Sequence, residues 1–217
     1  MVSPVWVKIC GITNLVDALA VAQAGADALG FNFVSTSPRA MSRDAVSQIL
    51  PALPPTVLTV GVVANENPDF LKGLLRVCPL KAFQFHGEEA PGEVLALKGE
   101  ARLIKAIRVK DAKSLKEIPR FQGVDAILLD TYQREKQGGT GTPFDWKLAV
   151  EAKTYGIPII VAGGLRPSNI TDVIQQVQPY GADVASGVEL APGRKDRALA
   201  REFILRAKQA SSVQISS

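Results

Sequence analysis

Residues 159–187 read IIVAGGLRPSNITDVIQQVQPYGADVASG, and this stretch holds the pattern that decides the fold. A short apolar run, Ile159–Ala162, ends at a Gly-Gly pair, and an amphipathic segment over Asn169–Gln176 follows it. A second short run, Val184–Ser186, ends at another glycine. Short apolar runs separated by helical patterns are typical of strand–helix–strand units, whose strands lie parallel. The stretch therefore predicts a parallel sheet with helices between its strands.

The same alternation continues through the whole chain. Eight apolar runs are predicted to be strands: Val5–Cys10, Ala28–Phe33, Leu58–Val63, Ala82–Phe85, Leu103–Ile107, Ala126–Asp130, Ile159–Ala162 and Val184–Ser186. Most are nearly continuous, as expected for strands that are buried on both faces. Helices are predicted between and after them at Leu15–Ala24, Ser42–Leu53, Pro68–Val77, Pro91–Leu97, Ala112–Glu117, Trp146–Ala152, Asn169–Gln176 and Asp196–Lys208.

The number of units favours a closed barrel over an open sheet. Eight strand–helix units in 217 residues take about 27 residues each, near the lower size limit of the (β/α)₈ fold. An open doubly wound sheet usually carries a GxGxxG turn after its first strand, and the turn Cys10–Asn14 has none. We therefore predict an α/β, single-domain (β/α)₈ TIM barrel over residues 1–210, followed by a frayed polar tail over 211–217.

Composition narrows the class of partners. The net charge is +4 and spread along the chain, with no basic run interleaved with aromatic residues, which argues against nucleic acid binding. No apolar run approaches the roughly 18 residues of a membrane span, and no leader pattern stands at residues 1–8, so we expect a cytoplasmic protein. Two distant cysteines and a single histidine suit a reducing compartment and are too few for a structural zinc site.

Three glycine-bearing loops suggest a phosphate site. They are Gln137–Gly141 after the sixth strand, Ala162–Leu165 after the seventh, and Ser186–Val188 after the eighth. Glycine lets backbone N–H groups approach an anion closely, and a helical turn beginning near Gly187 would add its positive end. In a barrel these loops are neighbours on the rim. A single Gly-Gly pair indicates only a tight turn, but three such loops at strand ends predict a small phosphorylated substrate.

Cys10 and Asp130 are the candidates for acid–base chemistry. Cys10 ends the first strand on the same side as Lys8. Either a buried Lys8 ammonium or the dipoles of the glycine loops could raise the thiolate fraction above the roughly 3% of a free thiol. Its alternative role is that of a small packed hydrophobe. Asp130 ends the sixth strand and is either a loop cap or a catalytic carboxyl group at the barrel mouth.

Three further residues are candidates for substrate binding. Arg39 lies in the second βα loop, where its guanidinium would clamp a carboxylate unless it is a solvated surface residue. His86 ends the fourth strand and would contact the substrate or orient a loop. Asp183 opens the eighth strand and would accept a hydrogen bond from a sugar hydroxyl or pair with a neighbouring base.

Taken together, these motifs resemble the phosphoribosylanthranilate isomerase family of tryptophan biosynthesis. The matching segments follow the family's order from the first strand to the last: Val7–Thr13, Gly30-Phe31, Ser37–Arg39, Val60–Val63, Gln84–Glu88, Leu128–Asp130, Gly138–Gly141, Phe144–Trp146, Ala162–Leu165 and Asp183–Glu189. Their joint order is far more specific than any single motif. The resemblance implies a barrel of the ribulose-phosphate-binding type.

The resemblance also implies a reaction and a set of roles. The family opens the ribose ring of phosphoribosylanthranilate and isomerises it by an Amadori rearrangement without a cofactor or metal. By this resemblance, Asp130 is expected to be the general acid, Cys10 to be the general base, and Arg39 to bind the anthranilate carboxylate. Backbone groups of the three glycine loops are expected to bind the phosphate, at Gly141, Gly163, Gly164, Ser186 and Gly187. His86 and Asp183 are expected to contact the substrate, and the protein is expected to be a monomer or a homodimer.

The chain departs from the family pattern at two places. Ala185 stands where serine is common, and Thr142 stands where a lysine often follows the glycine. Neither change touches the expected acid or base. Two alternatives remain. One is an isomerase of the histidine-pathway type, which needs a second phosphate-binding site and a carboxylate after the first strand. The other is a non-catalytic barrel that binds phosphorylated ligands. Cys10 and the single set of glycine loops argue against the first, and the intact pair of Cys10 and Asp130 argues against the second.

Overall fold

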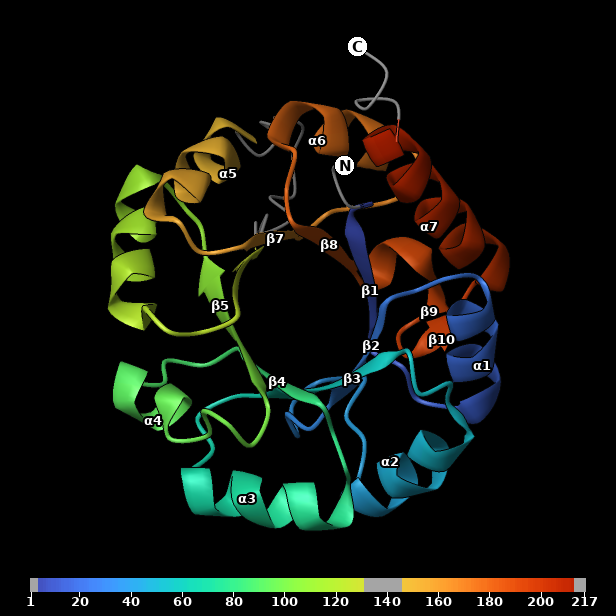
Figure 1. The fold of residues 1–217 in the computed structure, drawn as a ribbon. Helices are drawn as coiled ribbons and strands as arrows, with labels where there is room; N and C mark the ends of the chain where they lie inside the picture. Colours follow the sequence, from blue (N-terminus) through green and yellow to red (C-terminus); the bar gives the residue numbers. More distant parts are fainter. Residues whose placement is uncertain (1–3, 131–145, 213–217) are drawn as a thin grey trace.

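Eight parallel strands close into a barrel in the computed structural model, which describes residues 4–130 and 146–212 (Figure 1). Each strand pairs with the next along the chain, and β8 pairs with β1 to close the ring. The predicted (β/α)₈ barrel is confirmed. The strands are β1 (Trp6–Cys10), β2 (Ala28–Asn32), β3 (Leu58–Val63), β4 (Ala82–Phe85), β5 (Arg102–Arg108), β6 (Ala126–Asp130), β7 (Ile159–Ala162) and β8 (Gly181–Val184).

The predicted strands match the observed ones closely, with one exception. β3, β4, β6 and β7 have the predicted bounds, whereas β8 begins at Gly181, three residues before the predicted run. Asp183 is therefore the third residue of the strand and not its opening residue. An acidic residue is not expected inside a buried strand, so the apolar pattern did not reveal the first residues of β8. Asp183 is buried there because it forms an ion pair with Lys8. Ser186–Val188, predicted to begin inside the strand, instead forms a short 3₁₀ turn.

Helices surround the barrel (Figure 1). They are α1 (Leu15–Gln23), α2 (Arg43–Ile49), α3 (Pro68–Val77), α4 (Pro91–Leu95), α5 (Trp146–Ala152), α6 (Ile170–Val177) and α7 (Arg197–Ser212). The fifth predicted helix is a 3₁₀ helix, η2 (Ala112–Phe121), which contains Pro119. Proline cannot donate a backbone hydrogen bond, which disfavours a regular α-helix at this position.

Several helix starts follow from their first residues. The side chains of Asn14 and Ser42 accept hydrogen bonds from the first-turn N–H groups of α1 and α2. Asn67 does the same for α3, where Pro68 occupies the first turn. These side chains satisfy backbone donors that have no partner within the helix. The caps at Ser42 and Asn67 therefore explain where α2 and α3 begin.

The C-terminal helix runs past the expected start of the polar tail. α7 extends to Ser212, and Ser211 is buried. The Ser211 hydroxyl accepts a hydrogen bond from the Val5 N–H at 3.2 Å and donates to the Lys208 carbonyl at 2.8 Å. Ser211 therefore belongs to the barrel, because it ties α7 to the residue preceding β1. Residues 213–217 lie outside the described part of the chain.

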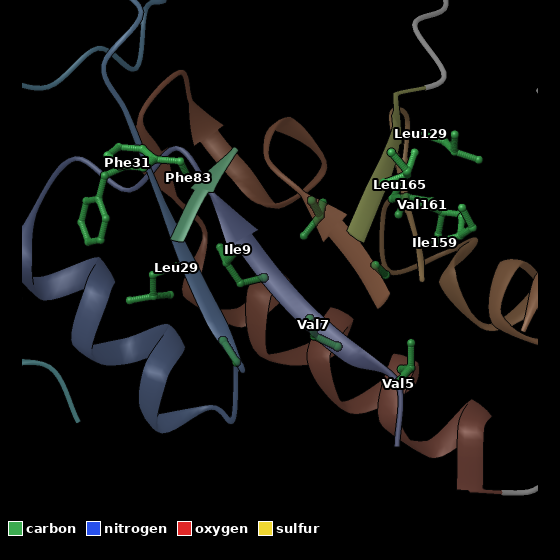
Figure 2. Packing of buried hydrophobic residues seen from close by; sticks show 14 of the residues in the cluster. Val5, Val7, Ile9, Leu29, Phe31, Phe83, Leu129, Ile159, Val161 and Leu165 are labelled. Carbon is green, nitrogen blue, oxygen red and sulfur yellow. The ribbon is translucent and has the colours of Figure 1, made fainter. Parts of the chain in front are cut away.

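The apolar residues form two separate cores. The larger lies between the strands and the helices and includes Val5, Val7 and Ile9, which lie along one side of β1 (Figure 2). The smaller lies inside the barrel and is built mostly of small side chains, among them Ala28, Ala82 and Ala126. Because successive residues of a strand point to opposite faces, Lys8 and Cys10 of β1 point to the barrel interior. In residues 4–130 and 146–212, no helix is long and apolar enough to cross a membrane.

A buried ion pair connects β5 to the loops that follow β3 and β4. Lys105 of β5 lies 2.7 Å from a carboxylate oxygen of Glu89, and the Lys105 ammonium also donates to the Gly87 carbonyl. Glu89 accepts hydrogen bonds from the N–H groups of Asn65 and Gly87. Both charged side chains are almost fully buried. The pair thus fixes the loops that follow β3 and β4 against β5.

We predict that Glu89→Gln lowers the free energy of unfolding by about 3 kcal/mol at neutral pH, because it leaves the Lys105 ammonium buried without a counter-charge. Chemical denaturation measures this difference. The matched control is Glu117→Gln, which removes the exposed ion pair with Arg120 and should cost less than about 1 kcal/mol.

The cost of Glu89→Gln should also depend on pH. Burial favours a raised pKa for Glu89, but hydrogen bonds from Lys105 and from the Asn65 N–H outweigh it and lower the pKa. The stability that the carboxylate adds is complete above the ordinary glutamate pKa of about 4.3 and is lost as the pH falls through the lowered native value. The gap between wild type and variant should shrink below about pH 4, and a gap that widened there would contradict this account.

Candidate active site

A cavity of about 520 Å³ lies at the C-terminal ends of the strands. Enzymes of the barrel fold place their catalytic groups at this face. The cavity walls include most of the residues singled out in the sequence, from six different strands and their loops: Cys10, Arg39, His86, Asp130, Gly163, Gly164, Asp183, Ser186 and Gly187. A larger cavity of about 850 Å³ over β4, β5 and η2 shares only His86 with it and contains neither Cys10 nor Asp130. The smaller cavity is therefore the candidate site.

Cys10 shares the barrel interior with a buried ion pair. The Lys8 ammonium is fully buried and lies 2.9 Å from a carboxylate oxygen of Asp183. Gly30, the neighbour of Cys10 on β2, makes room for both side chains. A Cβ atom there would lie 2.7 Å from the Cys10 sulfur and 3.1 Å from the Lys8 nitrogen. Of the two roles considered for Asp183, pairing with a base is the observed one.

Burial controls the ionisation of this cluster. Desolvation raises the pKa of the Cys10 thiol, and the Lys8 ammonium acts in the opposite direction without cancelling that effect. Burial therefore sets the net direction, whereas Lys8 lowers the pKa of Cys10 as expected. Burial also works against the Lys8 ammonium, but Asp183 and Cys10 beside it raise the pKa of Lys8. The cluster thus keeps a positive charge next to the sulfur.

Asp130 belongs to a second polar cluster on the cavity wall. Its carboxylate lies 3.2 Å from Nε2 of His86, and Nδ1 of His86 lies 3.0 Å from the amide nitrogen of Gln84. Asp130 ends β6, Gln84 belongs to β4 and His86 follows it directly. Both Asp130 and His86 retain some exposure to the cavity. The structure therefore brings His86 to Asp130, a contact that the sequence did not predict.

Arg39 is neither a free clamp nor a solvated surface residue. Its Nε lies 2.8 Å from one carboxylate oxygen of Glu189, and its Nη2 lies 2.5 Å from the other. A Cβ atom at Gly11 would lie 2.4 Å from the Arg39 side chain, so glycine there allows the arginine to pack against the backbone just after β1. Glu189 is thus a site residue that sequence reasoning missed, although it closes the motif Asp183–Glu189.

Lys195 is the second residue that the sequence analysis missed. It lies in a small hairpin of β9 (Glu189–Ala191) and β10 (Arg194–Lys195), and its ammonium lies 2.8 Å from Glu189. It also donates hydrogen bonds to the carbonyls of Cys10 and Ala185. Burial tends to raise the pKa of Glu189, but the hydrogen bonds from Arg39 and Lys195 lower it. A single lysine in a loop gives no sequence signal for this role.

The glycine loops after β7 and β8 pack directly against each other. A Cβ atom at Gly187 would lie 1.8 Å from the Leu165 carbonyl oxygen, so only glycine fits. Gly163 and Gly164 have φ values of 83° and 66°, which favour glycine. Within the described residues, the N–H groups of Gly164, Ser186 and Gly187 have no hydrogen bond acceptor. All three residues line the cavity wall, and backbone N–H groups without a partner suit an anion.

The structure bears only in part on two expectations from the sequence, the phosphate contact of Gly141 and the absence of a metal. Gly141, the remaining expected phosphate contact, lies outside the described residues. Within the described ranges, no group of three or more His, Cys, Asp or Glu side chains is placed to hold a metal ion. The chemical groups at hand are therefore a thiol, a carboxyl group, an imidazole, paired cations and backbone donors.

The chain matches one family of known proteins over almost its whole length. The model of the family described as N-(5'phosphoribosyl)anthranilate (PRA) isomerase matches residues 7–206. An N-(5'-phosphoribosyl)anthranilate isomerase from Geobacter sulfurreducens is 49% identical over 94% of this chain and 98% of its own. The one from Rubrobacter xylanophilus is 45% identical over 93% of this chain and 98% of its own.

Solved structures agree with this match. The phosphoribosyl anthranilate isomerase from Thermotoga maritima is 39% identical, with a TM-score of 0.88 over 94% of this chain and 99% of that one. A phosphoribosyl anthranilate isomerase in complex with reduced 1-(o-carboxyphenylamino)-1-deoxyribulose 5-phosphate is 36% identical, with a TM-score of 0.86 and the same coverage. The motif resemblance is thereby confirmed, and the chain belongs to the N-(5'-phosphoribosyl)anthranilate isomerase family.

Proposed function

We propose that the protein converts N-(5-phosphoribosyl)anthranilate into 1-(2-carboxyphenylamino)-1-deoxyribulose 5-phosphate, a step of L-tryptophan biosynthesis. The observation that carries the proposal is the placement of one thiol and one carboxyl group, Cys10 and Asp130, on the wall of the same cavity. An aldose–ketose isomerisation with ring opening needs one proton donor and one proton acceptor at neighbouring atoms. Family membership supports this assignment.

The reaction divides the proton transfers between the two residues. Asp130 donates a proton to the ribose ring oxygen, the bond between that oxygen and C1′ breaks, and a double bond forms between C1′ and the anthranilate nitrogen. The Cys10 thiolate then removes the proton from C2′. The electrons of that C–H bond form an enol amine, which tautomerises to the ketone. No oxidant or reductant is consumed.

The remaining wall of the cavity matches the two ends of this substrate. The N–H groups of Gly164, Ser186 and Gly187 are available to a phosphate, with Gly163 completing the turn after β7. Arg39 is assigned to the anthranilate carboxylate. Glu189 occupies Nε and one Nη of its guanidinium, which leaves N–H donors on the other edge. The backbone donors at one end of the cavity thus suit the phosphate of the substrate, and the guanidinium of Arg39 suits its carboxylate.

The proposal also covers the cellular location and the oligomeric state of the protein. We infer a cytoplasmic protein, since both cysteines are free and buried and suit a reducing compartment. A dimeric phosphoribosylanthranilate isomerase is known from Thermotoga maritima. The oligomeric state of this chain, a monomer or a homodimer, stays a prediction.

We predict that Asp130→Asn lowers kcat by about 10²- to 10⁴-fold, because an amide cannot donate the ring-opening proton. The assay supplies phosphoribosylanthranilate, made in situ, and follows the loss of its anthranilate fluorescence. Asp172→Asn, on the exposed surface of α6, is the matched control and should turn over like wild type. Substantial activity in Asp130→Asn would contradict the assignment of the acid, and no turnover by folded wild type would contradict the proposed function.

The raised pKa of Cys10 predicts a pH dependence. Burial makes the thiolate scarce at neutrality, so kcat/KM should rise as the pH increases from about 7 to 9. Cys10→Ser should be much slower and should lack this rise, because a hydroxyl group does not ionise in that range. Cys78→Ser changes the other buried cysteine, outside the cavity, and should keep the wild-type profile. An unchanged alkaline profile in Cys10→Ser would rule out the thiol as the base.

Arg39→Met should act mainly on binding. Loss of a hydrogen bond between charged groups costs about 1.5–3 kcal/mol, so KM should rise by about 10- to 100-fold while kcat changes less. Steady-state kinetics measures both constants, and circular dichroism checks folding. Arg43→Met removes an exposed arginine and serves as the control. A fall in kcat at constant KM would place Arg39 in the chemical step and not in ground-state binding.

A further inference from the structure

Gln84, His86 and Asp130 form a chain of hydrogen bonds along the cavity wall. The Gln84 amide nitrogen lies 3.0 Å from Nδ1 of His86, and Nε2 of His86 lies 3.2 Å from Asp130. All three residues line the candidate site. Gln84 is only 1% exposed and points into the barrel, between Val62 of β3 and Ile104 of β5. Its packing therefore holds the amide in place.

The donors and acceptors of these three side chains fix the direction of the hydrogen bonds between them. An amide NH₂ group donates hydrogen bonds and accepts none, so Nδ1 of His86 must present its lone pair to Gln84. A neutral imidazole then carries its proton on Nε2, from which it donates to Asp130. We propose that Gln84 is a positioning residue that holds His86 neutral in its Nε2–H tautomer, so that the imidazole is a hydrogen bond donor to the catalytic acid.

The orientation of the Gln84 amide decides between two opposite arrangements. If the amide were turned round, its oxygen would face Nδ1 and require a proton there. The lone pair of Nε2 would then face Asp130. In the observed orientation the Gln84 oxygen is buried, and no described residue donates to it. Among the described residues, the hydrogen bond with His86 is thus the only polar contact that orients the amide.

This arrangement matters for proton delivery, a consequence that rests on the proposed function. A lone pair of His86 directed at Asp130 would compete with the ribose ring oxygen for the acid's proton. With Gln84 occupying Nδ1, His86 offers Asp130 a donor and no basic atom. The Nε2–H group can then stabilise the carboxylate that remains after ring opening. Gln84 thereby acts on the chemical step through His86.

Several charged groups surround His86 in the described part of the chain. The charged or titratable residues that share a cavity wall with it come from β1, β5, β6 and β8, from the loops after β2, β4, β5 and β7, and from η2. They are Cys10, Arg39, Glu88, Glu89, Lys105, Arg108, Lys110, Glu117, Arg120, Asp130, Arg166 and Asp183. Among these, only Asp130 lies within ion-pair distance of the ring. Glu89 and Lys105 pair with each other, as do Asp183 and Lys8. The two groups that set the tautomer are therefore Gln84 and Asp130.

The sequence makes this proposal directly testable, because His86 is the only histidine. In an untagged protein labelled with ¹⁵N-histidine, one ring gives all the signals, and their two-bond ¹H–¹⁵N pattern distinguishes the two tautomers. The wild type at about pH 8, above the ordinary range of histidine titration, should show the Nε2–H form. The Nδ1–H form in the wild type would overturn the proposal without any need for a variant.

Two substitutions sharpen the test. The carboxylate introduced by Gln84→Glu accepts only, so it should move a proton to Nδ1, whereas Gln84→Met should leave a mixture of tautomers. Ile104→Val removes a methylene from the neighbouring inward position on β5 and controls for barrel packing. It should keep the Nε2–H form. A Gln84→Met variant that still showed only the Nε2–H form would overturn the proposal, because Gln84 would then not set the tautomer.

Kinetics separates this proposal from the proposed function. Gln84→Met should lower kcat about tenfold, the equivalent of one neutral hydrogen bond, with little change in KM. Ile104→Val should retain the kcat of wild type. A protein that lacks turnover but shows the Nε2–H form would contradict the function and leave the positioning role intact. An active protein whose kcat does not respond to Gln84→Met would contradict the role of Gln84 in catalysis.

Discussion

The ion pair between Lys8 and Asp183 stands at the seam where the barrel closes. Lys8 and Asp183 are direct register partners of β1 and β8, the first and last strands. A fully buried ammonium without its counter-charge would cost several kcal/mol, and a slip of one residue would turn Asp183 to the opposite face. Closure in this register is therefore the arrangement that satisfies the charge. The other strands are mostly apolar, with buried polar exceptions such as Gln84 on β4 and Lys105 on β5, and apolar runs specify register less sharply.

The site inherits its geometry from this seam. Cys10 lies two residues beyond Lys8 on the same face of β1, and the turn at Ser186 lies three residues beyond Asp183. Lys195 then joins the two strand ends through the carbonyls of Cys10 and Ala185, and Glu189 connects Lys195 to Arg39. The thiol, the loop after β8 that is proposed to bind phosphate, and the guanidinium thus occupy fixed positions relative to one pair of buried charges.

Local patterns in the sequence were sufficient for the barrel and for the location of its active face. Apolar runs and their glycine turns depend on neighbouring residues, so seven strands and the loops around Gly163 and Gly187 were predicted well. Long-range pairs left no such pattern. Arg39 and Glu189 are 150 residues apart, and Lys8 and Asp183 are 175 apart, so the partners of Arg39 and the true start of β8 were missed. The net pKa shift of Cys10 was missed for a related reason, because burial is a property of the closed barrel and not of the segment around the thiol.

The two catalytic candidates need opposite protonation states, and the distribution of charge around them differs accordingly. Cys10 must lose its proton, and the ammonium groups of Lys8 and Lys195 both act to lower its pKa against the effect of burial. Asp130 must begin with its proton, and no lysine or arginine among the described residues forms an ion pair with it. Its described partner is an imidazole, which supplies a hydrogen bond without a permanent positive charge. Among the described residues, two ammonium groups thus act on the candidate base, whereas no lysine or arginine lies within ion-pair distance of the candidate acid, although both groups share a cavity of about 520 Å³. A barrel makes this separation possible because its strands bring side chains with different surroundings to a common rim.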